Sequence, residues 1–136
     1  MKIGYYQGTW DVLHVGHINA LEVARSLCDY LLVGVATNEF YFELKHRQPA
    51  RDWSDRMAVV RAIKYVSAVI PYSTLDPYDI WIRMKYDVFF VSDEYCTDYH
   101  KTHTLKNLYA SGVTIFFLPR TPAISSSEIK QVIKAM

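Results

Sequence analysis

The stretch Gly8-Thr9-Trp10-Asp11-Val12-Leu13-His14-Val15-Gly16-His17 follows a strand-like segment at residues 2–7. Its two glycines allow the backbone to approach a ligand closely. From residue 16 to about residue 26, the apolar side chains recur at helical spacing, which predicts a helix. The first turn of such a helix presents free N–H groups and the positive end of the helix dipole. The stretch therefore predicts an anion site between a strand and a helix.

Two histidines, His14 and His17, stand three residues apart at the start of this predicted helix. Both side chains can reach the same anion, and each can donate a hydrogen bond to a phosphoryl group that gains charge during a reaction. The same spacing would also provide half of a zinc site. Because the sequence lacks a cysteine pair and a well-spaced third ligand, the phosphoryl interpretation is favoured and no protein-held metal is expected.

Strand-like and helix-like segments alternate over the rest of the chain. Residues 30–36, YLLVGVA, form a continuous apolar run that is typical of a parallel strand covered on both faces. Further strands are predicted at 67–71, 87–91 and 113–118, with helices after Asp52, from Asp76 to about Lys85, at 105–110 and from Ser125, and with 38–51 as a loop or a short helix. The alternation predicts a single α/β domain over residues 1–136, with helices on both faces of a parallel sheet and functional residues at strand ends.

Composition narrows the classes of partner. The chain has 136 residues, of which 51% are hydrophobic, and its net charge is +1. This charge gives no electrostatic argument for a nucleic acid or a membrane surface as partner, and no apolar run approaches the roughly 18 residues that span a bilayer. Cys28 and Cys96 lack the CxxC spacing, and no secretory signal precedes them. Reduced thiols and a cytoplasmic location are therefore expected.

The stretch from Gly8 to His17 resembles the signature of the cytidylyltransferase-like nucleotidylyltransferase superfamily, Gly-Thr-Phe-Asp followed by His-x-Gly-His, with Trp10 in place of Phe. The resemblance extends over nearly the whole chain and is greatest to the glycerol-3-phosphate cytidylyltransferase branch. It implies a Rossmann-like, five-stranded parallel sheet in the order 3-2-1-4-5, a homodimer, and Mg²⁺ bound with the nucleotide. It also implies catalysis by His14 and His17 and nucleotide binding by Gly8, Thr9, Trp10, Asp11 and Gly16, where Asp11 either orients the loop or contacts the metal.

Two further segments resemble phosphate-binding motifs of that branch. Arg120-Thr121-Pro122-Ala123-Ile124-Ser125-Ser126-Ser127 resembles Arg-Thr-x-x-Ile-Ser-Thr-Thr, which implies a catalytic Arg120 and nucleotide binding by Thr121, Ile124, Ser125, Ser126 and Ser127. Lys45-His46-Arg47 resembles a Lys-x-Lys clamp, which implies a catalytic Lys45 and a nucleotide-binding Arg47. A solvated basic loop explains Lys45-His46-Arg47 equally well.

The segment Ser92-Asp93-Glu94-Tyr95 resembles Gly-Asp-Asp-Trp of the same branch, and this implies that Asp93 and Glu94 lie near the nucleotide base. Ser92 and Tyr95 depart from that motif. On the helix after Asp52, Lys64 stands where the branch has Arg, and Ser67 stands where Asp is common, so the roles of Arg56 and Lys64 stay open. Residues 96–103 are either a lid over the acceptor or an ordinary polar loop.

The implied reaction is an in-line displacement in which an acceptor phosphate attacks the α-phosphorus of a nucleoside triphosphate and pyrophosphate leaves. Transfer from CTP to a small phosphorylated alcohol, similar to glycerol 3-phosphate, is the leading hypothesis. Transfer from ATP on the same fold is the second. A nucleotide-binding module without turnover is the third, and the two histidines speak against it because binding alone does not need both.

Overall fold

A computed structural model describes residues 1–92 and 105–119, which form one α/β domain around a sheet of five parallel strands. The elements run in the order β1 (Ile3–Gly8), α1 (Val15–Ser26), β2 (Tyr30–Ala36), α2 (Asn38–Lys45), α3 (Trp53–Arg61), β3 (Ala68–Tyr72), α4 (Pro77–Met84), β4 (Val88–Ser92), α6 (Lys106–Ala110) and β5 (Thr114–Leu118). The strands pair in the order β3-β2-β1-β4-β5, as expected. Strand order reverses between β1 and β4, the position at which such sheets bind ligands.

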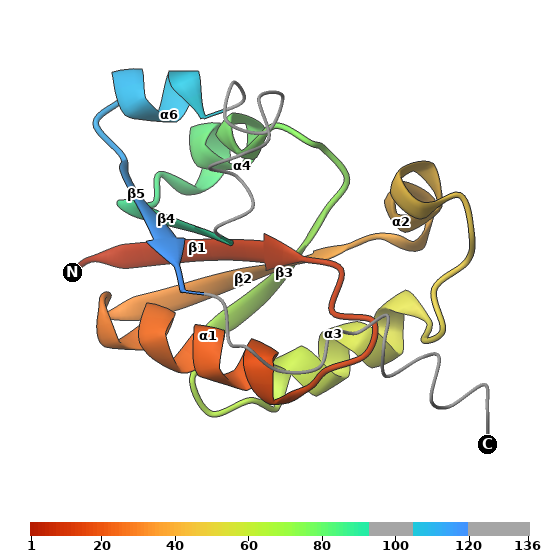
Figure 1. The fold of residues 1–136 in the computed structure, drawn as a ribbon. Helices are drawn as coiled ribbons and strands as arrows, with labels where there is room; N and C mark the ends of the chain where they lie inside the picture. The colour runs from red at the N-terminus through yellow and green to blue at the C-terminus, as the bar shows by residue number, and fades with distance from the viewer. Residues whose placement is uncertain (93–104, 120–136) are drawn as a thin grey trace.

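Helices cover both faces of the sheet (Figure 1). α1 and α3 pack below it in that view, and α4 and α6 pack above it. Successive strand residues point to opposite faces, so each strand contributes to two apolar clusters. Tyr5, Leu32 and Phe89 belong to the cluster under α4 and α6, whereas Val33 and Phe90 belong to the one under α1 and α3.

The sequence predictions place the strands to within one residue, the usual uncertainty of element ends. Residues 38–51 contain the short helix α2, which the Thr37 hydroxyl caps by accepting from the Phe40 N–H at 3.2 Å. One expectation was wrong. Lys64 does not lie on the helix after Asp52, because α3 ends at Arg61 and Lys64 follows in the turn before β3. The helix expected from Ser125 falls outside the described residues.

The carboxyl ends of β1 and β2 point toward α2, which lies beyond the end of the sheet (Figure 1). The loop from Thr9 to His14 also leaves from this end, between β1 and α1. The sheet therefore gathers the anion-site stretch, α2 and the connection from α2 to α3 at one edge.

Candidate active site

His14 and His17 form a reciprocal cap at the start of α1. His14 is the N-cap residue, and its Nδ1 accepts from the Gly16 N–H at 3.0 Å. The Nδ1 of His17 accepts from the His14 N–H at 3.2 Å, and the two ring centroids lie 4.1 Å apart. A ring nitrogen that accepts a hydrogen bond carries no proton, so each ring bears its proton on Nε2. The backbone therefore orients both imidazoles as Nε2–H donors.

His17 stays uncharged at neutral pH. Burial, and secondarily the charge of His14, lower the pKa of His17 from 6.5 to about 4. Removing an imidazolium from water disfavours its charged form, and a second imidazolium nearby disfavours it further. His17 is therefore a neutral hydrogen-bond donor in the ligand-free protein, with its geometry set before any anion arrives.

Trp10 holds the loop that carries these histidines. Its backbone has a φ of 53°, which is unusual for a residue other than glycine, and its side chain is buried. The indole Nε1–H donates to the Gly34 carbonyl of β2 at 2.9 Å. The indole also covers Gly8, where an added Cβ would come within 3.1 Å of the ring. The replacement of Phe by Trp thus adds a hydrogen bond between the loop and β2.

Asp11 is buried, and its carboxylate fixes the connection from α2 to α3. Oδ2 accepts from the Ala50 N–H and from the Tyr41 hydroxyl, each at 3.0 Å, and Oδ1 accepts from the Arg51 N–H at 2.9 Å. Of the two roles left open for Asp11, orienting a loop is the one that these contacts perform. Within residues 1–92 and 105–119, no group of three or more His, Cys, Asp or Glu side chains could hold a metal ion.

Arg56 ties three segments of the site together, a role that the sequence left open. This fully buried side chain donates to the carbonyls of Thr9 at 2.7 Å, Ala36 at 2.8 Å and Arg51 at 3.1 Å, and to Asn38 Oδ1 at 2.7 Å. These acceptors offset the cost of burying a guanidinium. Because they come from the loop after β1, the end of β2 and the connection after α2, Arg56 sets their relative positions.

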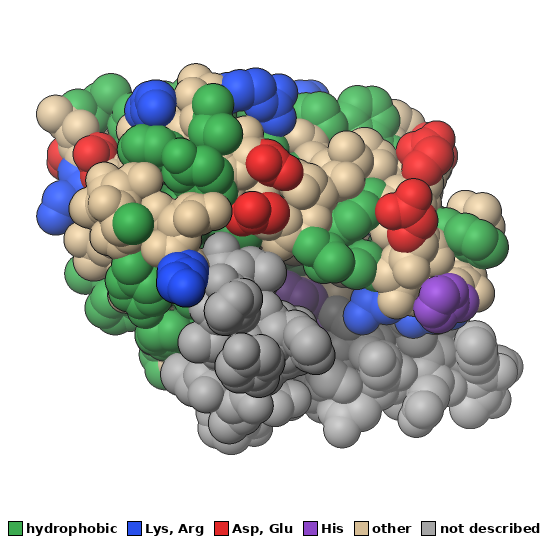
Figure 2. Space-filling model, turned by 90° about the horizontal axis from the view of Figure 1, so that it is seen from above, with side chains coloured by type: hydrophobic (Ala, Val, Ile, Leu, Met, Phe, Trp, Pro, Cys, Tyr) green, Lys and Arg blue, Asp and Glu red, His purple; other side chains and the backbone are tan. Residues whose placement is uncertain are grey.

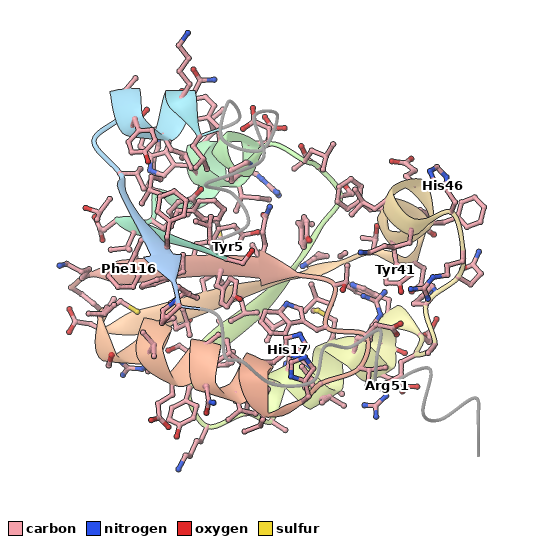
Figure 3. All side chains as sticks on the ribbon, viewed as in Figure 1. Tyr5, His17, Tyr41, His46, Arg51 and Phe116 are labelled. Carbon is pink, nitrogen blue, oxygen red and sulfur yellow. The ribbon has the colours of Figure 1, made fainter. Side chains whose placement is uncertain are left out.

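Tyr41, a residue that the sequence did not single out, lies between two guanidinium groups. The Cζ atoms of Arg47 and Arg56 each lie 5.7 Å from the centroid of its ring, a distance typical of cation–π contacts. Tyr41 also donates to Asp11. Figure 3 shows Tyr41 and Arg51 at the same end of the molecule as His17. Helical periodicity marks Tyr41 as a core residue, and nothing in the pattern reveals its partners.

A pocket of about 510 Å³ opens at this edge of the sheet. Its lining includes five of the residues that the sequence predicted, namely Gly8, Thr9, Trp10, His17 and Lys45. Ser92 lines it from the end of β4. Asp11 and Arg47 contact Tyr41, and His14 stacks beside His17. Asp93, Glu94, Arg120, Thr121, Ile124, Ser125, Ser126, Ser127 and the segment 96–103 lie outside the described residues.

Basic side chains are concentrated near the pocket. Lys45, His46, Arg47 and Arg51 are all exposed. Figure 2 shows basic and histidine side chains together at the α2 end of the face seen from above. His46 has a left-handed backbone with a φ of 58°, which ends α2 and turns the chain toward the segment that Asp11 holds. Lys64 and Ser67 lie elsewhere. Lys64 contacts the Tyr65 ring, and the Ser67 hydroxyl accepts from the Leu31 N–H at 2.9 Å, at the start of β3.

Comparison with known proteins follows the same lines. The family model described as "Cytidylyltransferase-like" matches residues 5–132. The chain is 35% identical to the glycerol-3-phosphate cytidylyltransferase of Bacillus subtilis (strain 168), with all of both chains covered. It is 30% identical to that of Staphylococcus aureus, over 96% of this chain and 94% of the relative. A solved structure of a lipopolysaccharide core biosynthesis protein from Thermoplasma volcanium superposes with a TM-score of 0.75 at 25% identity, covering 89% of this chain and 98% of that one.

None of the described helices is long and apolar enough to cross a membrane. The comparisons and the pocket therefore bear on the same edge of one domain.

Proposed function

Because the chain belongs to the cytidylyltransferase-like family, we propose that it transfers CMP from CTP to a small phosphorylated alcohol, similar to glycerol 3-phosphate, and releases pyrophosphate. The observation that carries the proposal is the pair of histidines at the start of α1. Both rings are held by backbone N–H groups at Nδ1, and His17 lines the pocket beside Gly8 and Lys45.

In the proposed reaction, an oxygen of the acceptor phosphate attacks the α-phosphorus of CTP in line with the departing pyrophosphate. The acceptor oxygen is already anionic, so no side-chain nucleophile is required. His14 and His17 donate Nε2–H groups to the α-phosphoryl oxygens as charge builds up on them. Because the backbone fixes both rings in advance, this stabilisation needs little reorganisation during the reaction.

Lys45 and Arg47 provide positive charge for the phosphates. Lys45 is the one Lys or Arg among the described residues that line the pocket. Arg47 lies over the Tyr41 ring, which restrains a side chain that would otherwise move freely in solvent. Arg120, Thr121, Ile124 and Ser125–Ser127 are proposed as further phosphate and nucleotide contacts, and Asp93 and Glu94 as contacts near the base, on the motif resemblance alone.

We propose that Mg²⁺ enters this site with the nucleotide. Mg²⁺ commonly binds through substrate phosphates and few protein ligands. The three hydrogen bonds that Asp11 accepts already occupy its carboxylate, which fits a metal held chiefly by the phosphates. The ion would neutralise charge on the triphosphate, and the histidines and Lys45 would act on the remaining oxygens.

A pyrophosphate-release assay tests the proposal. The four common nucleoside triphosphates are offered with Mg²⁺ against a panel of phosphorylated alcohols and phosphonates. CTP is expected to be used in preference to ATP, and His14→Ala with His17→Ala is the inactive control. Preferential use of ATP would favour the adenylyltransferase hypothesis. Nucleotide binding with no release for any acceptor would favour the binding module and overturn the proposal.

Two wider expectations accompany this function. A homodimer is proposed on the family resemblance, and sedimentation at micromolar concentration tests it, because the mass of a single chain would reject it. The cytoplasm is proposed as the compartment. The free thiol of Cys28 is consistent with reducing conditions.

A further inference from the structure

The pocket has two sides, and this inference about them rests on the proposed function. Strand order places β2 and β3 on one side of β1 and places β4 and β5 on the other. A nucleotide is expected at the reversal of strand order, between β1 and β4. The acceptor must approach the α-phosphorus from a different direction, which leaves the β2–β3 side for it. We call this side the acceptor wing. It consists of Phe40, Leu44, Lys45, Tyr72, Thr74 and Leu75.

The acceptor wing is mostly apolar. Phe40 and Tyr72 are buried and meet edge to face, with ring centroids 5.5 Å apart. Leu44 is half-buried on the neighbouring turn of α2. Leu75 lies at the mouth, and its side chain is 64% exposed. A leucine left in water at the entrance of a pocket is covered when an apolar ligand binds, which favours that ligand.

The hydroxyl of Thr74 is already engaged within the protein. It donates to Asp79 Oδ2 at 2.8 Å and accepts from the Asp76 N–H at 3.1 Å. The described lining residues include no Asp or Glu, and Lys45 supplies a positive charge. An acceptor hydroxyl buried here would lose its water without gaining equivalent partners, and an ammonium group would face a cation with no carboxylate.

We propose that the acceptor is a phosphate or phosphonate whose organic part is a short hydrocarbon chain or ring without hydroxyls. Its phosphate lies near Lys45 and the histidines, and its organic part lies against Phe40, Leu44 and Leu75. The wing therefore selects against polyol phosphates such as glycerol 3-phosphate, although the phosphoryl chemistry is the same for both.

A matched pair of acceptors tests this selectivity. Propyl phosphate and glycerol 3-phosphate have the same three-carbon chain and the same phosphate, and they differ by two hydroxyl groups. With CTP and Mg²⁺, kcat/KM is expected to be at least about 10-fold higher for propyl phosphate, the discrimination typical of a change of this size. Equal values, or a preference for glycerol 3-phosphate, would overturn the inference while leaving cytidylyl transfer intact.

Binding provides a second readout that does not require turnover. Calorimetry with each acceptor, in the presence of a non-hydrolysable CTP analogue, should give the same order of affinities. If neither acceptor drives pyrophosphate release, this affinity order still decides the inference. Absence of release with every nucleotide and acceptor would count against the proposed function instead.

Substitution of the wing locates the preference. Leu75→Asn is expected to lower the propyl-over-glycerol ratio by about fivefold or more, mainly through KM for propyl phosphate. Leu27→Asn is the matched control, because Leu27 is also an exposed leucine (40%) but lies at the far end of α1, outside the pocket lining. An unchanged ratio in Leu75→Asn, or an equal drop in both variants, would remove the wing as its source.

Discussion

The hydroxyl of Tyr41 donates a hydrogen bond to the buried carboxylate of Asp11 at 3.0 Å, and this contact joins α2 to the loop that follows β1. The same tyrosine ring lies against Arg47 and Arg56. Asp11, Tyr41 and Arg56 thus form a connected support behind the pocket. The proposed phosphate-binding side chains are mounted on this support, so its effects on stability and on ligand binding can be separated.

Substitutions of Tyr41 separate these two effects. Tyr41→Phe removes one hydrogen bond to a carboxylate and should destabilise the fold by about 1.5–3 kcal/mol while keeping the aromatic face under Arg47. Tyr41→Leu removes both, so it should also raise the KM for CTP with a smaller change in kcat. Thermal unfolding and steady-state kinetics measure the two effects. A KM for CTP that is the same in both variants would show that the ring does not position Arg47.

The depressed pKa of His17 predicts acid sensitivity. The folded state releases this proton at about pH 4, whereas the unfolded chain takes it up near pH 6.5. The contribution of His17 is therefore complete above pH 6.5 and is lost as the pH falls from 6.5 toward 4, by at most about 3 kcal/mol. Chemical denaturation across this range, compared between the wild type and His17→Gln, measures the loss. Parallel pH profiles would contradict the assignment to His17.

The same group also predicts a response to ligand. An anion bound at the start of α1 favours imidazolium, so nucleotide should raise the pKa of His17. Titration of the His17 ring signal by NMR, with and without CTP, tests this. A pKa that stays near 4 in the presence of saturating nucleotide would place the phosphates away from this ring.

The paired histidines should affect turnover more than binding. Much of the charge on the α-phosphoryl oxygens develops near the transition state, so His14→Ala and His17→Ala should each reduce kcat by on the order of 10²–10³ and leave nucleotide affinity within a few-fold. The double variant should lose less than the product of the single losses, because both rings act on one phosphoryl group. Normal turnover of both single variants at saturating substrate would exclude this mechanism.

Arg56 should be critical for stability. Arg56→Lys cannot supply the hydrogen bonds that now reach four acceptors, so it should cost on the order of 3–5 kcal/mol and lower Tm by roughly 10 °C or more. Arg61→Lys is a matched control, because Arg61 is exposed at the end of the same helix. Its change should stay within about 0.5 kcal/mol. Equal melting temperatures for the two variants would show that the buried contacts of Arg56 contribute little.

Local patterns in the sequence were sufficient to place the strands and most of the helices. Apolar periodicity depends on neighbouring residues, and a helix start that holds His14 and His17 brings them onto one anion because they lie three positions apart. The order of the strands came from the family resemblance, and the structure confirms it. The exact end of the helix before Lys64 was predicted wrongly, because tertiary packing rather than periodicity ends it.

The sequence by itself determined an alternating α/β chain with a histidine pair placed to meet a phosphate. Only the tertiary structure decided what Asp11, Tyr41 and Arg56 do, and which apolar side chains face the pocket rather than the core. The physical reason is distance along the chain. Arg56 and Thr9 are 47 positions apart, and Tyr41 and Asp11 are 30 apart, so folding alone brings each pair into contact.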